Sequence, residues 1–197
     1  MNVENFSVES LESSSRLALL ASEMPDKCMV VEDLDRPIFA LTQETRGELP
    51  PVSTETRGRL EDGGFPESVL DAVGSEAEAN IYENASLEPE QVNGRDVLVR
   101  TDIDYEKIDP VTELTNLQRM EKGRPPLDAN SKPIELHHIG QKQDSPLAEL
   151  TSSEHRGQGN DNILHNKIKE SEIDREDFDK ERQEHWKERA NQINSQN

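Results

Sequence analysis

The sequence predicts an α+β protein, in which a helical and hairpin amino-terminal extension precedes a carboxy-terminal domain. Helical patterns and one hairpin signal occupy residues 66–99. Residues 133–150 then hold two short extended segments, and helical patterns follow as far as residue 193. Strands and helices that occur in such blocks, rather than in strict alternation, favour the α+β class.

The composition predicts one ordered part and one loosely ordered part. Only 31% of the 197 residues are hydrophobic and 32% are charged, which is lean for a globular chain of this length. We expect a flexible acidic arm over residues 1–28, a small α+β region over residues 29–99 and a separate domain over residues 100–197.

Three kinds of structure are not expected. Cys28 is the only cysteine, so the chain can form neither an internal disulfide nor a cysteine-based zinc site. No apolar run approaches membrane-spanning length. The polar, acidic start MNVENFSVESLESSS lacks the features of a secretory signal. If the protein leaves its cell, we expect another route, or export as part of a longer chain.

Local signals place the elements of the amino-terminal extension. Residues 29–41 are expected to hold two short extended segments, and residues 42–64 a loop. A proline at a first helical position predicts a short helix from Pro66 to Gly74. Four-residue apolar steps predict a second helix over residues 77–85. The pair Asn93-Gly94 between two extended runs predicts a tight hairpin.

The carboxy-terminal part is expected to follow the order strand, loop, strand, helix. Thr115 caps a predicted short helix that stops at Gly123. Residues 133–139 and 146–150 read as strands, and Asn160 or Asp161 can cap the helix that follows. The charged stretch from Ser171 is read most simply as a solvated helix with a sparse apolar stripe.

Four of the five histidines fall between residues 137 and 165. Beyond packing, histidine acts at neutral pH as a metal ligand or as a general base. Hydrolysis of a phosphodiester needs both, because water must lose a proton while negative charge builds on the phosphoryl oxygens. The four histidines are therefore candidates for a metal-dependent hydrolytic site, with a structural zinc site as the alternative. His185 is expected to be an ordinary surface or packing residue.

These residues carry a family resemblance over roughly residues 100–190. The run Glu135-Leu136-His137-His138, followed by His155 and His165, resembles the HNH/endonuclease VII (His-Me finger) superfamily. It is most similar to the LHH subgroup, which occurs as toxin domains of bacterial polymorphic toxins, and is also similar to the ββα-metal finger of nuclease colicins. The resemblance implies a ββα-metal nuclease core within residues 100–197.

The resemblance also implies roles for individual residues. His137 would be a metal ligand and His138 the general base, with Glu135 supporting the site by orienting a histidine or an arginine. His165 and His155 would supply further ligands, although His155 could instead support a ligand. Adjacent residues on a strand point to opposite faces, so His137 and His138 can share a site only if the strand ends or bulges there, as Gly140 would allow.

Two groups of residues complete the expected site. The asparagine of the HNH pattern has no obvious counterpart, which leaves three residues as candidates for orienting the base: Ser145, Asn160 and Asn162. Four cationic residues are candidates for binding nucleic acid: Arg124, Lys142, Arg156 and Lys167. The metal would be a divalent ion, with zinc, nickel, manganese and magnesium left open.

The charge of the chain argues against a nucleic-acid partner. The formal net charge is -20, of which -14 falls on residues 1–99. Proteins that bind nucleic acid are expected to carry a basic footprint. Catalysis nevertheless needs only a local field at the phosphate. An acidic amino-terminal region could shield the site or bind a basic partner.

The function expected from the resemblance is cleavage of DNA, with RNA as the alternative substrate, at low sequence specificity. It implies a toxin that is delivered by a specialised system into the cytoplasm of a target cell and is blocked by a cognate immunity protein. The alternatives are a phage or defence nuclease without such a partner, and a zinc-stabilised binding module without enzymatic activity.

Overall fold

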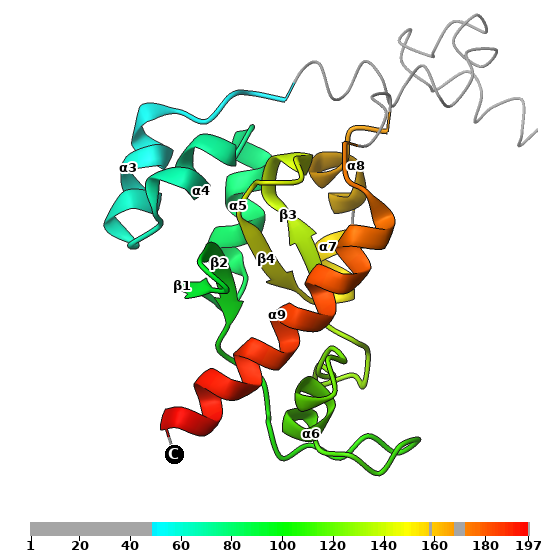
Figure 1. The fold of residues 1–197 in the computed structure, drawn as a ribbon. Coiled ribbons are helices and arrows are strands. Elements are labelled where there is room, and N and C mark those ends of the chain that lie inside the picture. The colour runs from blue at the N-terminus through cyan, green and yellow to red at the C-terminus, as the bar shows by residue number, and fades with distance from the viewer. Residues whose placement is uncertain (1–48, 158, 168–171, 197) are drawn as a thin grey trace, which may run out of the picture. The chain divides into compact units, whose positions relative to one another are not determined.

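The computed structural model describes residues 49–157, 159–167 and 172–196, which all belong to one compact unit (Figure 1). The arm expected over residues 1–28 and the segments expected within residues 29–41 lie outside the described residues. Within the described ranges, no helix combines the length and the apolar character that crossing a membrane requires.

Three short helices open the described part of the chain. Helices α4 (Glu67–Ala72) and α5 (Glu76–Asn84) occupy the two stretches in which helices were expected. The expectation of a loop over residues 42–64 is wrong in part, because Thr54–Asp62 form helix α3. The side chain of Ser53 accepts a hydrogen bond from the amide of Thr56, which satisfies one free N–H of the first turn.

Four strands form a mixed sheet in the order β1-β2-β4-β3. The hairpin prediction is confirmed, because β1 (Leu87–Val92) and β2 (Arg95–Arg100) are antiparallel around a two-residue turn. Asn93 and Gly94 both have positive φ there, 51° and 74°, as such turns require.

The two predicted strands of the carboxy-terminal part are also present. Strands β3 (Glu135–His138) and β4 (Leu147–Leu150) pair antiparallel, and β4 continues the sheet parallel to β2. Because β3 is the last strand of the sheet, one of its sides is not paired with another strand of the sheet. The division expected at residue 99 remains a prediction, and the sheet extends across it.

Helices cover both faces of the sheet. Helices α7 (Ser152–Arg156) and α8 (Asn160–Leu164) share one face with α3, α4 and α5, whereas α9 (Arg175–Gln196) lies on the other (Figure 1). Helix α6 (Asn116–Glu121) packs against α9. Alternation along the strands follows this division: Leu98, Ala148 and Leu150 pack toward α3–α5, and Val97, Val99 and Leu147 pack with Phe178 of α9.

The long helix α9 is held to the sheet by a buried network of charges. Glu149 of β4 is fully buried, and its carboxylate accepts hydrogen bonds from His185 Nε2 at 2.8 Å and Arg189 Nε at 3.1 Å. The amide of Arg100 donates to the same carboxylate at 2.8 Å. Trp186, the only tryptophan of the chain, is buried beside this network. The expectation of a solvated helix is therefore wrong for this face of α9. Of the two roles expected for His185, surface or packing, its burial agrees with packing.

Candidate metal centre and active site

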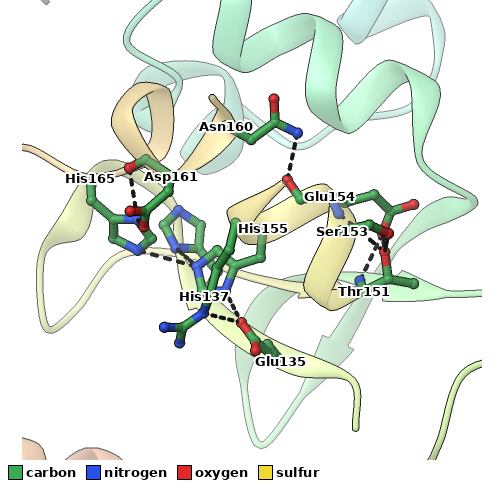
Figure 2. A network of polar contacts seen from close by, with 10 residues as sticks. Glu135, His137, Thr151, Ser153, Glu154, His155, Asn160, Asp161 and His165 are labelled. Carbon is green, nitrogen blue, oxygen red and sulfur yellow. Dashed lines mark hydrogen bonds and ion pairs between the residues drawn. The ribbon is translucent and has the colours of Figure 1, made fainter. Parts of the chain in front are cut away.

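Three histidine rings converge on one point, as the family resemblance implied. His137 comes from β3, His155 from α7 and His165 from the residue that follows α8. His155 Nε2 lies 3.1 Å from His137 Nδ1 and 3.1 Å from His165 Nε2. Figure 2 shows the three rings turned toward one another. Their ring nitrogens all lie within 4.8 Å of one another.

Short helices on the same side of the sheet bring His155 and His165 to β3. Helix α7 begins with a capping box, in which the Thr151 hydroxyl accepts from the Glu154 amide and the Glu154 carboxylate accepts from the Thr151 amide. This helix was not expected, although its Thr-x-x-Glu signature stands in the sequence. Gly159, with φ 86°, starts α8, which ends immediately before His165.

Hydrogen bonds at the far sides of two rings fix which nitrogen faces the centre. His155 Nδ1 donates to Glu135 Oε2 at 2.5 Å, and His165 Nδ1 lies 3.0 Å from Asp161 Oδ1 and 3.1 Å from the Asp161 carbonyl (Figure 2). Protons on these Nδ1 atoms leave both Nε2 atoms with lone pairs toward the centre. Carboxylates and carbonyls orient metal-ligating histidines in this way in other proteins.

The electrostatic surroundings keep the ligand candidates in the state that binds metal. Burial lowers the pKa of His137 well below 6.5, and the neighbouring His155 and His165 lower it further. Burial also lowers the pKa of His155, although its hydrogen bond to Glu135 acts in the opposite direction. Neutral imidazole is the form that ligates metal, so His137 and His155 are available at neutral pH.

The three residues fit a divalent cation. Zinc-to-nitrogen distances of about 2.0–2.1 Å place two ligands of a tetrahedral site about 3.3 Å apart. The separations of His155 Nε2 from His137 Nδ1 and from His165 Nε2, both 3.1 Å, are close to that spacing. Three imidazole ligands leave a fourth position for water or substrate, as catalytic rather than structural zinc sites do.

Glu135 forms hydrogen bonds with both kinds of residue that the resemblance suggested, a histidine and an arginine. Its Oε2 accepts from His155 and from Arg156 Nε, the latter at 2.8 Å. Burial acts to raise the pKa of Glu135, but the hydrogen bonds from Arg156 and His155 outweigh it and the pKa is lowered. The carboxylate therefore stays ionised at neutral pH. It contacts His155 on the side of the ring that faces away from the cluster, which is the position of a supporting group rather than of a ligand.

His138 projects to the opposite face of β3 and meets α9. Its side chain is fully buried, with the ring centroid 4.6 Å from that of Phe178. His138 Nε2 lies 3.1 Å from Glu181 Oε2, while Nδ1 is buried without a hydrogen-bond partner in the described part of the chain. The strand ends at His138, and the backbone then turns through Gly140 with φ 75°.

His137 and His138 point to opposite faces of β3, and yet both line one cavity of about 780 Å³. This is possible because β3 is an edge strand, so a pocket along its unpaired side has access to both faces. His155, His165 and Glu135 line it from one face, and Phe178, Asp179 and Arg182 of α9 line it from the other.

The lining of this cavity is basic in an otherwise acidic chain. It contains two carboxylate residues, Glu135 and Asp179, against five cationic ones. The cationic residues are Lys122, Arg124, Arg156, Arg175 and Arg182. The local charge is therefore opposite in sign to the net charge of -20, which removes the objection that the composition raised.

The structure brings together some of the predicted nucleic-acid-binding residues and not others. Arg124 and Arg156 line the cavity, whereas Lys142 and Lys167 are not among its lining residues. Lys167 forms an ion pair with Asp161. Arg175 and Arg182 also line the cavity, and they were not among the expected residues because the position of α9 against β3 could not be read from its charge pattern.

The residues predicted to orient the base make other contacts. Asn160 donates to the carbonyl of Glu154 at 2.8 Å, and the Ser145 hydroxyl donates to the carbonyl of Lys142 at 2.7 Å. Asn162 is exposed on α8. The side chains that face His138 are instead Glu181 and Phe178, three residues apart on α9, together with Arg95. No signal in the sequence connected them with His138, and the roles assigned to the individual site residues remain predictions.

Comparison with known proteins gives the same family as the residues. Residues 115–192 match the family described as a nuclease of the HNH/ENDO VII superfamily with conserved LHH. No curated protein and no solved structure matches the chain significantly. The matched segment runs from the cap of α6 into α9 and contains Leu136-His137-His138 and all three clustered imidazoles. Over residues 115–192 the chain is an LHH nuclease of the HNH/ENDO VII superfamily, and hence a phosphodiesterase.

Proposed function

We propose that the protein is a metal-dependent endonuclease that hydrolyses DNA phosphodiester bonds with little sequence specificity. The observation that carries this proposal is the basic cavity in which three converging imidazoles and His138 meet at the edge of β3. Its cationic groups suit backbone phosphates, which are the same in every sequence.

The residues divide the chemistry between them. A divalent cation held by His137, His155 and His165 would stabilise negative charge on the phosphoryl and leaving oxygens. His138 would take the proton of the attacking water, since its Nδ1 is without a partner among the described residues. Arg156 and Glu135 hold one another beside His155, and the exposed Arg124 and Arg175 reach the phosphates on either side.

A plasmid-nicking assay across a series of divalent metals tests this function. His138→Ala should lower the rate of cleavage by about 10²- to 10⁴-fold, which is the usual contribution of a general base. Its affinity for metal should stay that of the wild type, because His138 lies on the other face of β3 from the cluster. Equal cleavage by wild type and variant would remove His138 from the mechanism. Absence of cleavage by both with every metal would favour a zinc-stabilised binding module.

Salt dependence tests the basic lining. Arg175→Ala should weaken binding to DNA about equally for all sequences and reduce the slope of log K against log salt by about 1. Lys180→Ala is the matched control, since Lys180 is also exposed on α9 but is not among the residues that line the cavity. Binding isotherms at several salt concentrations measure both. Equal slopes for the two variants would show that Arg175 does not contact the backbone phosphates of bound DNA.

We further propose that the protein acts as an antibacterial toxin in the cytoplasm of a target cell, after delivery by a specialised system, and is neutralised by an immunity protein. The resemblance of the segment around Leu136-His137-His138 to toxin domains supports this role. The basic cavity also offers a surface that an acidic inhibitor would complement. Toxicity on expression that a small neighbouring gene product relieves would support the toxin role. Expression without toxicity would favour a phage or defence nuclease.

A further inference from the structure

Glu181 of α9 connects His138 with a second strand of the sheet. Its Oε2 lies 3.1 Å from His138 Nε2, and its Oε1 lies 2.5 Å from Arg95 Nη1 of β2. The same Arg95 nitrogen donates to the carbonyl of Gln143 at 3.2 Å. Arg95 thus holds one oxygen of the carboxylate, and the other oxygen lies next to the imidazole that the proposed function uses as its base.

The ring of His138 is confined from more than one direction. Phe178, one helical turn before Glu181, packs against it with an angle of 59° between the rings. The guanidinium of Arg182 lies over the Phe178 ring, 5.5 Å from its centroid. The His138 side chain is fully buried, and the side chain of Glu181 is only 22% exposed. A carboxylate that is largely shielded from water requires a charged partner, and Arg95 provides it.

We infer that Glu181 is a positioning residue for His138, and that Arg95 positions Glu181 in turn. Two groups approach His138 Nε2, namely Glu181 Oε2 at 3.1 Å and the Arg95 guanidinium at 3.5 Å. The carboxylate is the nearer of the two and favours the tautomer that carries its proton on Nε2, which leaves the unpartnered Nδ1 as the nitrogen that can accept a proton. Bases in other hydrolytic sites are oriented by a third group in this manner. Glu181 would fill the place for which the sequence suggested Ser145, Asn160 or Asn162.

This inference rests on the proposed function, and steady-state cleavage by the full-length, metal-loaded protein tests it. Glu181→Ala should lower kcat about 10- to 100-fold, in the range found when an outer partner of a site histidine is removed. KM and metal affinity should stay within twofold of the wild type. Glu181→Gln, which keeps an acceptor oxygen of the same reach, should restore part of kcat. Glu184→Ala is the matched control on the exposed side of α9 and should change neither constant.

A double-mutant comparison separates positioning from a structural effect. If Glu181 acts through His138, adding Glu181→Ala to His138→Ala should lower kcat no further, because the group to be positioned is already absent. An independent and additive loss would overturn the inference. A rise in kcat for Glu181→Ala would overturn it as well, since that would make Glu181 a block on the base. An effect confined to KM would do the same.

The proposed function and this inference fail in different ways. If His138→Ala cleaves like the wild type, the proposed base is wrong and the inference falls with it. If His138→Ala loses cleavage but Glu181→Ala does not, only the inference is overturned. Nitrogen-15 chemical shifts of the His138 ring give a readout apart from activity. The wild type should carry the ring proton on Nε2, and Glu181→Ala should populate the other tautomer. An unchanged tautomer would contradict the positioning role.

Discussion

Replacement of His137 by alanine is expected to abolish tight binding of divalent metal and to lower DNA cleavage by more than about 100-fold. Loss of an outer partner of a ligand already costs about 10- to 100-fold, and His137 supplies one of only three nitrogens in the cluster. Isothermal titration with zinc, nickel, manganese and magnesium measures the affinity, and plasmid nicking measures the activity.

The adjacent residue provides the matched control. His138→Ala removes an imidazole of the same size from the same strand, but from the face that contacts α9. We expect it to bind metal like the wild type and to lose cleavage only. The assignment of the ligands would be contradicted if the two variants bound metal equally well, or if His138→Ala bound it less tightly than His137→Ala.

Replacement of Glu149 by alanine is expected to lower the free energy of unfolding by about 3–5 kcal/mol, as breaking a buried ion pair usually does. The variant leaves His185 and Arg189 buried without the carboxylate that both contact. Urea unfolding followed by the fluorescence of Trp186 reports on this region directly, since the ring lies beside His185. Glu184→Ala, exposed on the same helix, should change the free energy by less than about 0.5 kcal/mol.

The network around Glu149 should also make the free energy of unfolding depend on pH in the acid range. Burial acts to raise the pKa of Glu149, but His185, Arg189 and the Arg100 amide outweigh it and hold the pKa below its ordinary value of 4.5. A carboxyl whose pKa is lowered by folding stabilises the native state above its unfolded pKa, and that contribution is lost as the pH falls through the folded pKa. The free energy of unfolding should therefore fall below about pH 4.5 in the wild type, with a shallower slope in Glu149→Gln. Equal slopes would contradict the assignment.

The local parts of the fold could be predicted from the sequence, because their signals are local. Asn93-Gly94 fixes a hairpin through its positive φ angles, and Thr115 with Gln118 forms the capping box of α6. The metal cluster was predictable for another reason. The family resemblance named His137, His155 and His165, and the structure brings those three rings together.

The parts that could not be predicted depend on contacts between distant segments. Glu181 lies 43 residues after His138 in the chain, and only the packing of α9 across the sheet brings their side chains together. The burial of His185 has the same origin, because Glu149 lies 36 residues away on β4. The charge pattern of α9 indicates a helix exposed to water, and it carries no information on which of its charges are paired in the interior.

Strand β3 lies at the edge of the sheet, and its successive side chains point to opposite faces. The face that each histidine reaches therefore depends on the register of the strand. Pairing of His137 with Ala148 and of His138 with Leu147 decides which ring turns toward α7 and α8 and which toward α9. A shift of β3 by one residue would exchange the faces that the two rings occupy. His137 would then face Phe178, and His138 would face α7 and α8. The four pairs that join β3 to β4 thus determine which histidine faces the cluster and which faces α9.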